Sequence, residues 1–318
     1  MKIAATVVTF NRLDKLMECI TAIRSQSVRP DMIVVVNNSS TDNTLNWLNE
    51  QRDIHTFTQA NLGSGGGQHA AMKIACELGC DWVWSMDDDG APHKHALKYL
   101  IEATTVKPDA KVFNSIVLDT CDKDTIAFAY RWKGNMYKGA AGELHTSYNR
   151  LLSKVSEDWI LEGNPQFFNS TFINKEVISQ IGLPLTELFI RGDEIEFIYR
   201  VQQAGFETYT VLKSIMYHPH PPEKNFMFLG RSINYEEVNS FKRYYSVRNA
   251  IISTKFYLKK STLTVFKIFL RELVIIICTS KKNQLRENLT VLMKATRNAG
   301  RFDIKSEILK SQLRIEKV

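Results

Sequence analysis

The sequence predicts an α/β fold, in which a mostly parallel sheet with a Rossmann-like nucleotide-binding half is followed by a C-terminal helical extension. Short apolar runs alternate with segments of helical periodicity through about the first 110 residues, and a lysine-rich stretch with helical spacing follows residue 240. The chain of 318 residues is 44% apolar and holds only 15 Gly and 8 Pro, which excludes fibrous and low-complexity proteins.

Four strands separated by helices are expected in the first third of the chain. β-branched and apolar runs predict strands at residues 3–9, 32–36, 54–58 and 82–86. Helices are predicted between these strands, at residues 13–23, 41–48 and 67–78. This alternation favours a parallel sheet with helices on both faces, which binds its ligands at the carboxyl ends of the strands.

The remainder of the chain is less regular. Strands are predicted at residues 112–118, 167–173, 208–212 and 215–218, a helix at residues 193–204, and mainly helix from residue 244 onward. We find no internal repeat and no low-complexity linker, so a boundary near residue 230 is only weakly marked.

Charge is divided unevenly along the chain. Residues 1–240 carry a net charge of −6 and residues 241–318 a net charge of +13. A basic segment of this kind is attracted to an anionic membrane surface or to nucleic acid, or it is simply a solvated face. Residues 261–280 are strongly apolar, but three charged residues interrupt them and disfavour a membrane-spanning helix. A helix in the membrane interface and a helix packed on the main domain both remain open.

Cysteine usage and the N-terminal residues bear on location. The five cysteines are too few and too scattered for a disulfide scaffold. The apolar run near the N-terminus is too short for a secretory signal. We therefore expect the chain to remain in a reducing cytoplasm.

Acidic residues follow the fourth predicted strand. Asp87, Asp88 and Asp89 come directly after it, and their mutual repulsion is tolerable when a divalent cation lies among them. The alternative is an exposed acidic loop. The position at the carboxyl end of a strand in an open sheet favours a metal site.

Three further segments carry candidate chemistry, and each has a structural alternative. Residues 61–68 open the third predicted helix with glycines whose N–H groups suit a phosphate or sugar, although a flexible turn has the same composition. Asp193 and Glu194 begin a helix, where they cap its first turn or one of them acts as a base. His218 and His220, in the proline-rich segment 217–222, can bind a cation or lie in a surface loop.

In their order along the chain, these segments resemble the motifs of glycosyltransferase family 2. The resemblance covers roughly residues 1–220 and rests on the segments VVTFNR (7–12), VNNSSTD (36–42), NLG (61–63), MDDD (86–89) and GDEIE (192–196). The MDDD segment and a later YYSVRN (244–249) look most similar to bacterial galactofuranosyl- and rhamnosyltransferases of surface polysaccharides.

The resemblance implies a GT-A fold, an inverting mechanism and a nucleoside-diphosphate sugar donor, with UDP-galactofuranose or dTDP-rhamnose favoured. It also implies a catalytic domain over residues 1–230, followed by a basic helical region over residues 231–318. Within the catalytic domain, residues 1–110 would bind the nucleotide sugar and residues 111–230 the acceptor.

Roles for individual residues follow from the same resemblance. The residues implied in donor binding are Thr9, Phe10, Arg12, Asn38, Gly66, Asp87 and Asp88. A divalent cation, Mn²⁺ or Mg²⁺, would be bound by Asp89, Asp87 and His218, with His220 as the fallback. Many relatives have aspartate where this chain has Asn37. Glu194 takes the place of the usual base, and Asp193 is the alternative.

A lipid-linked saccharide acceptor would give the basic region a use, because that region would hold the active site over the anionic inner face of the plasma membrane. Two other functions fit parts of the sequence. A nucleic-acid-binding protein would use the same basic region, but no base-reading module is recognisable and we expect no nucleic-acid partner. A sugar nucleotidyltransferase would need glycines after the first strand, and residues 9–12 contain none.

Overall fold

The computed structural model describes residues 1–318 except 134–141, 156–157, 164, 221–222 and 314–318. Within the described part, eleven strands form one sheet whose main path runs in the order β3-β2-β1-β4-β10-β6-β11-β5. The first four strands along the chain are β1 (Ile3–Thr9), β2 (Met32–Asn37), β3 (Ile54–Thr58) and β4 (Trp82–Asp87). They pair in parallel, as predicted.

The other half of the sheet contains both strand directions. β10 (Asn169–Asn174) is antiparallel to its neighbours β4 and β6 (Val112–Asp119), and β11 (Tyr209–His218) is parallel to β6. Because β10 reverses direction between them, β1, β4, β6 and β11 all end at the same edge of the sheet. The remaining strands are β5 (Ala91–Pro92), β7 (Thr125–Trp132), β8 (Glu143–Ser147) and β9 (Ile160–Glu162).

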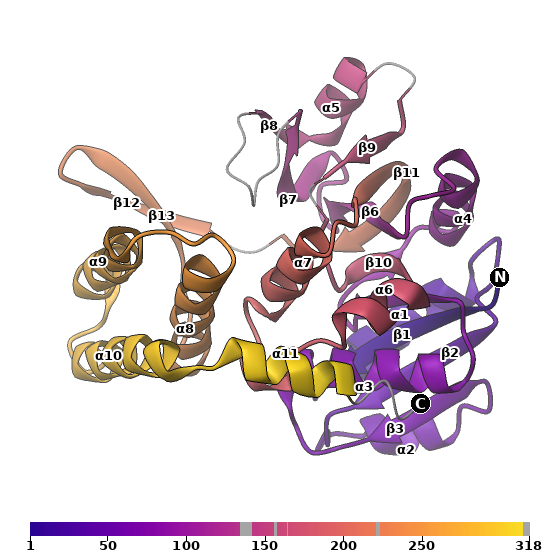
Figure 1. The fold of residues 1–318 in the computed structure, drawn as a ribbon, viewed down its shortest axis with the longest axis horizontal. Coiled ribbons are helices and arrows are strands. Elements are labelled where there is room, and N and C mark those ends of the chain that lie inside the picture. The colour runs from indigo at the N-terminus through magenta and orange to yellow at the C-terminus, as the bar shows by residue number, and fades with distance from the viewer. Residues whose placement is uncertain (134–141, 156–157, 164, 221–222, 314–318) are drawn as a thin grey trace.

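Helices cover both faces of the sheet and bury its apolar side chains (Figure 1). One face packs against α1 (Leu13–Arg24), α2 (Thr44–Asn49) and α4 (Ala96–Val106). The other packs against α3 (Gly63–Glu77), α6 (Lys175–Ile181) and α7 (Asp193–Gln203). A short helix, α5 (Tyr148–Val155), packs beside β7 and β8.

The C-terminal helices form a separate bundle that contacts this body. Its elements are α8 (Ser240–Phe256), α9 (Thr262–Thr279) and α10 (Leu285–Arg301). Leu185, Leu188 and Tyr199 share a buried cluster with the bundle, so the two parts have a continuous apolar contact. α11 (Ile304–Leu313) extends from α10 onto the face that carries α3 and α6 (Figure 1).

Some predicted elements differ from the observed ones. α3 begins at Gly63, four residues before the predicted start, so the glycine-rich segment is helical rather than a turn. The two strands predicted at 208–218 are one strand, β11, with a register shift between Val211 and Ile215. The hairpin of β12 (Glu223–Phe228) and β13 (Arg231–Glu236) was not predicted, and it spans the boundary expected at residue 230.

Candidate active site

The site forms where β1, β4 and β11 end at one edge of the sheet. Asp88 follows β4, is 4% exposed and accepts a hydrogen bond from Thr9 Oγ1 at 2.7 Å. Burial raises the pKa of Asp88 to about 6, although the Thr9 hydroxyl and the Arg12 charge favour the carboxylate. The ends of two adjacent strands therefore share one buried polar contact.

Two cationic groups flank Asp89. Arg12 Nη1 lies 2.6 Å from Asp89 Oδ2 and 3.3 Å from Asp88 Oδ1. On the other side, His218 Nε2 at the end of β11 lies 3.3 Å from Asp89 Oδ1. Burial opposes the charge on Asp89, but His218 and Arg12 outweigh it and lower its pKa to about 2. The same contact raises the pKa of His218 above its ordinary value in spite of burial.

Asp87 faces α3 and is tied to Gln68. Gln68 Nε2 donates to Asp87 Oδ1 at 3.1 Å, while Gln68 Oε1 accepts from Ser85 Oγ at 2.6 Å. Burial and the charges of Asp89 and Asp88 raise the pKa of Asp87 to about 7. Sequence reasoning missed the role of Gln68, because glutamine is not a titratable residue and its contact depends on the packing of α3 on β4.

Asp193 and Glu194 have different surroundings although they are adjacent. Asp193 is 1% exposed, and its Oδ2 has no hydrogen-bond partner among the described residues. Burial, the charge of Glu194 and the charge of Asp87 raise its pKa well above the ordinary value, which favours the protonated form. Glu194 is partly exposed, and its Oε2 accepts a hydrogen bond from Gly192 N at 2.9 Å.

The nucleoside side of the expected site is built from β1 and β2. Phe10 is 42% exposed directly after β1. Asn38 is buried, donates to Gly63 O at 3.0 Å and accepts from Gln59 Nε2 at 2.9 Å, so its amide holds the start of α3. A side chain on Gly66 would meet Leu62 and Thr186, so packing explains this glycine and its donor contact stays a prediction.

Comparisons with known proteins point to one family. The family model described as glycosyl transferase family 2 matches residues 5–161. Galactofuranosyltransferase GlfT1 of Mycobacterium tuberculosis (strain H37Rv) is 30% identical over 250 residues, which are 77% of this chain and 79% of that protein. GlfT1 of Mycolicibacterium smegmatis is 29% identical over 251 residues, covering 78% of this chain and 81% of that protein.

The chain belongs to glycosyl transferase family 2. It is a glycosyltransferase related to galactofuranosyltransferases, which confirms the family and enzyme class expected from the sequence motifs.

Solved structures give the fold of this glycosyltransferase. GalNAc-T7, crystallised with UDP, GalNAc and Mn²⁺, superposes with a TM-score of 0.58 at 12% identity over 92% of this chain. The match spans only 54% of the GalNAc-T7 chain, about half of its length. S. aureus TarS 1–349 in complex with UDP-GlcNAc gives a TM-score of 0.54 at 12% identity and covers 99% of this chain and 91% of that one. The predicted GT-A fold is thereby confirmed.

The side chains at the end of β4 partly fit a divalent cation. A carboxylate oxygen of Asp89 and a ring nitrogen of His218 are ligand types that Mn²⁺ accepts, and they already face each other. Among the described residues, no three His, Cys, Asp or Glu side chains are grouped as metal ligands. The expected set of Asp89, Asp87 and His218 is not assembled, because Asp87 is bonded to Gln68. Two of the three expected ligands therefore lie together.

The fallback ligand His220 lies elsewhere. Its ring Nδ1 is 3.0 Å from the Ala127 carbonyl, and its backbone N–H donates to Asp119 Oδ1 at 3.0 Å. The two prolines that follow it in the predicted segment, at positions 221 and 222, lie outside the described residues. His218 is thus the histidine that the fold brings to Asp89.

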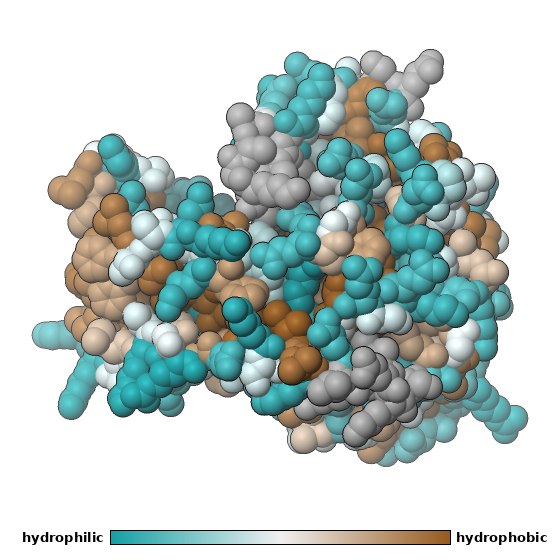
Figure 2. All heavy atoms as spheres, in the orientation of Figure 1, coloured by the Kyte–Doolittle hydropathy of each residue, from teal (hydrophilic) through white to brown (hydrophobic). Residues whose placement is uncertain are grey.

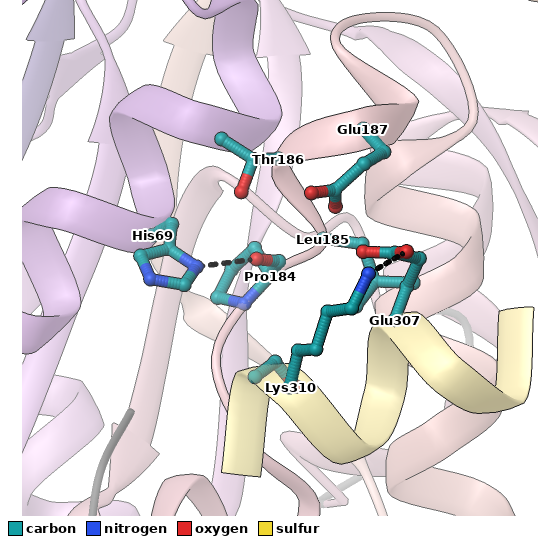
Figure 3. Close-up of a pocket in the computed structure, with 8 residues that line it drawn as sticks. His69, Pro184, Leu185, Thr186, Glu187, Glu307 and Lys310 are labelled. Carbon is teal, nitrogen blue, oxygen red and sulfur yellow. Dashed lines mark hydrogen bonds and ion pairs between the residues drawn. The ribbon is translucent and has the colours of Figure 1, made fainter. Parts of the chain in front are cut away.

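A pocket outside the site described above lies between α3, residues 184–187 and α11 (Figure 3). His69 points its ring at the Pro184 carbonyl, with Nδ1 2.8 Å from that oxygen, and Glu307 and Lys310 of α11 form an ion pair at 2.7 Å. The lining includes none of the predicted site residues. We therefore interpret this pocket as part of the packing interface between α11 and the part of the chain that contains the sheet.

Proposed function

We propose that this enzyme transfers galactofuranose from UDP-galactofuranose to a hydroxyl of a lipid-linked or surface saccharide, with inversion at the anomeric carbon. The observation that carries the proposal is the convergence of Thr9, Arg12, Asp88, Asp89 and His218 at the ends of three strands. The names of the GlfT1 relatives support the donor sugar, and the UDP in the titles of the structural neighbours supports the nucleotide.

Donor binding is assigned to the carboxyl ends of β1, β2 and β4. Phe10 would lie against the nucleobase, since an exposed aromatic ring offers a stacking face. Asp88, fixed by Thr9, would accept hydrogen bonds from the ribose hydroxyls. Arg12 would contact the diphosphate with the guanidinium that now pairs with Asp89. When bound at Asp89 and His218, Mn²⁺ or Mg²⁺ would offset the negative charge of the departing diphosphate.

Glu194 is the proposed base. Its carboxylate would remove the proton from the acceptor hydroxyl as that oxygen attacks the anomeric carbon and the bond from this carbon to the diphosphate oxygen breaks. Asp193 suits this role less, because burial raises its pKa and favours its protonated form. A protonated Asp193 would instead donate a hydrogen bond to Glu194 and so orient the Glu194 carboxylate.

A lipid-linked acceptor fits the surface of the C-terminal bundle, and we propose that the enzyme works at the cytoplasmic face of the plasma membrane. α9 exposes an apolar stripe with two cations in it, formed by Leu263, Phe266, Leu270, Ile277, Lys267 and Arg271. Figure 2 shows apolar side chains gathered over this end of the molecule. Such a surface suits anionic lipid better than nucleic acid, which offers no apolar phase for the stripe. No helix of the described residues is long and apolar enough to cross a bilayer.

The donor is tested by ligand-dependent melting. With Mn²⁺ present, we expect UDP and UDP-galactofuranose to raise the melting temperature, since a ligand at 100 times its dissociation constant adds about 2.7 kcal/mol of stability. Asp88→Asn should abolish this response. Asp81→Asn, at the opposite end of the same strand, should keep it.

Transfer is then followed by mass spectrometry with octyl galactofuranoside and octyl rhamnoside as acceptors. If dTDP-rhamnose raises the melting temperature and UDP-galactofuranose does not, the donor is dTDP-rhamnose. If no UDP-, dTDP- or GDP-sugar stabilises the protein with Mn²⁺, the proposed sugar transfer is wrong.

A further inference from the structure

Residues 187–191, which precede Gly192 and the acidic pair, have an unusual backbone. Phe189 and Arg191 have positive φ angles of 67° and 58°, and Gly192 follows at 103°. Non-glycine residues adopt this region at a cost of about 1–2 kcal/mol each. The segment therefore needs partners outside itself to keep this shape.

Those partners come mainly from two adjacent residues of α8. Asn249 Nδ2 lies 2.9 Å from the carbonyl oxygen of residue 188 and 3.0 Å from those of residues 190 and 191. Arg248 Nη2 donates to the carbonyls of residues 187 and 188 at 2.7 and 3.1 Å. The carbonyl of residue 189 accepts from Gly65 N of α3 at 2.9 Å. Every carbonyl from residue 187 to residue 191 is thus held, four of the five by α8.

The two α8 side chains are themselves fixed. Arg248 Nε donates to Asn249 Oδ1 at 2.9 Å, which orients the amide so that its N–H groups face the segment. The Arg248 guanidinium also lies 4.8 Å from the ring centre of Tyr245 and 5.7 Å from that of Phe302. Asn249 is 1% exposed and Arg248 9% exposed, so water does not compete for these contacts.

The contact continues to the acidic pair. A side-chain carbon on Gly192 would lie 2.9 Å from Asn249 Cβ, so the backbone passes directly against this residue. Asn249 binds the carbonyl of the peptide that joins Arg191 to Gly192, and the N–H of that same peptide donates to Glu194 Oε2. Rotation of this one peptide would release both hydrogen bonds.

We infer that Asn249, oriented by Arg248, is a positioning residue for the proposed base Glu194. The inference rests on the proposed function. Independently of that function, we infer that α8 sets the backbone conformation of residues 187–192. Nothing in the residue types of the YYSVRN segment indicates this role, because it depends on backbone carbonyls almost sixty residues earlier in the chain.

The test compares Asn249→Ala and Asn249→Asp with a matched control. Asn249→Asp keeps the shape but replaces the donating amide by an oxygen that faces three carbonyls. Asn298→Ala is the control, because Asn298 is a second asparagine of the same bundle whose Nδ2 donates to the Tyr244 hydroxyl and not to the carbonyls of residues 187–191. Three quantities are measured: kcat with UDP-galactofuranose and octyl galactofuranoside, the affinity for UDP with Mn²⁺, and hydrogen exchange of residues 187–194.

We expect both Asn249 variants to lower kcat by about 10- to 100-fold, the loss typical of a misplaced catalytic group. UDP affinity should stay within about 3-fold of the wild type, since Thr9, Arg12 and Asp88 are untouched, and exchange should accelerate at residues 187–194. Asn298→Ala should leave all three quantities unchanged.

An unchanged kcat in both Asn249 variants would overturn the inference. So would a joint loss of kcat, UDP affinity and cooperative melting in both, since Asn249 would then be a residue of general stability. If the wild type transfers no galactofuranose at all, the proposed function fails instead. Hydrogen exchange of residues 187–194 still tests the positioning role in that case.

Discussion

At the scale of single residues, the two carboxyl groups of the acidic pair have different surroundings. Asp193 is buried, which raises its pKa, whereas Glu194 is partly exposed and accepts a hydrogen bond from a backbone N–H. We expect Glu194→Gln to lower kcat by about 100- to 10,000-fold, the usual contribution of a general base. Asp193→Asn should lose far less, because an amide resembles a protonated carboxyl in shape and in hydrogen-bond donation. Initial rates at saturating donor and acceptor compare the two, and a larger loss in Asp193→Asn would make Asp193 the base.

The raised pKa of Asp193 also predicts a pH dependence of stability. An unfolded Asp has an ordinary pKa of 3.8, whereas the folded state keeps the proton well above this value. The stabilisation from this proton is complete below about pH 3.8 and is lost as pH rises toward the folded pKa. Between pH 3.8 and the raised folded pKa, the wild type should thus lose stability with rising pH more steeply than Asp193→Asn, by up to about 1.4 kcal/mol per pH unit. Urea denaturation at pH 5, 6 and 7 measures both slopes, and equal slopes would mean that Asp193 is ionised in the folded protein.

Sequence motifs predicted much of the site at this scale because their order along the chain is informative. Asp89, the last of the three aspartates after Met86, does meet the histidine at the end of β11, as a shared sheet edge requires. Gln68 and Asn249 were missed, since an amide side chain has no chemical signature until the fold shows which groups it faces. The catalytic and metal roles themselves stay predictions.

At the scale of elements, the close packing of α3 against its neighbours explains why glycine stands at several of its positions. A side-chain carbon on Gly63 would lie 2.1 Å from the Phe189 carbonyl oxygen, and one on Gly67 would lie 2.2 Å from Val8 Cγ1. These glycines let the helix approach both β1 and the segment before the acidic pair. The segment is glycine-rich because of close packing, a cause that sequence reasoning could not separate from phosphate binding.

Alanine substitutions test this explanation. Gly67→Ala should destabilise the protein by about 1–3 kcal/mol through overpacking, and Gly63→Ala by more, because its φ of 70° adds backbone strain. Gly300→Ala in α10 is the control, since open space surrounds it and alanine favours helix by about 0.5–1 kcal/mol. Thermal melts of the three variants give the comparison, and a neutral Gly67→Ala would contradict the packing argument.

The four strands of the parallel half were predicted closely, whereas β5, β7, β8 and β9 were not predicted. β1 and β3 have the predicted bounds; β1 is a fully buried apolar run, and β3 is a short edge strand of which only Ile54 is buried. β12 and β13 were missed because their apolar residues are few and only partly buried, so that the alternation is short and weak. The division into domains at residue 230 stays a prediction.

At the scale of the whole molecule, the apolar stripe of α9 lies at the end of the protein formed by the bundle and the β12–β13 hairpin (Figure 1). Arg271 of α9 donates to the Asn234 carbonyl of the hairpin at 2.8 Å, and the hairpin exposes Met227 by 67% and Leu229 by 88%. The helix and the hairpin therefore offer apolar side chains beside a cationic rim, as interfacial membrane proteins do.

Charge substitutions on the stripe test membrane binding. Phe266→Asp with Leu270→Asp should abolish sedimentation with vesicles of phosphatidylglycerol and phosphatidylcholine, because both the apolar contact and the positive potential are reduced. Phe57→Asp, on a ring that is 44% exposed on β3, should bind as the wild type does. Equal sedimentation of all three proteins would exclude the α9 stripe as the binding surface.

The contact of α8 and α11 with the catalytic body affects the order of events during synthesis. Gln312 of α11 donates to the Gln180 carbonyl at 3.0 Å, and Phe302 stacks on the arginine that holds residues 187 and 188. The ribosome makes α8 about 50 residues and α11 about 110 residues after the acidic pair, and domains generally begin to fold as they emerge. A nascent chain can thus complete its sheet while the pair is still unrestrained. Catalytic competence would then arise late, once the helical bundle has docked.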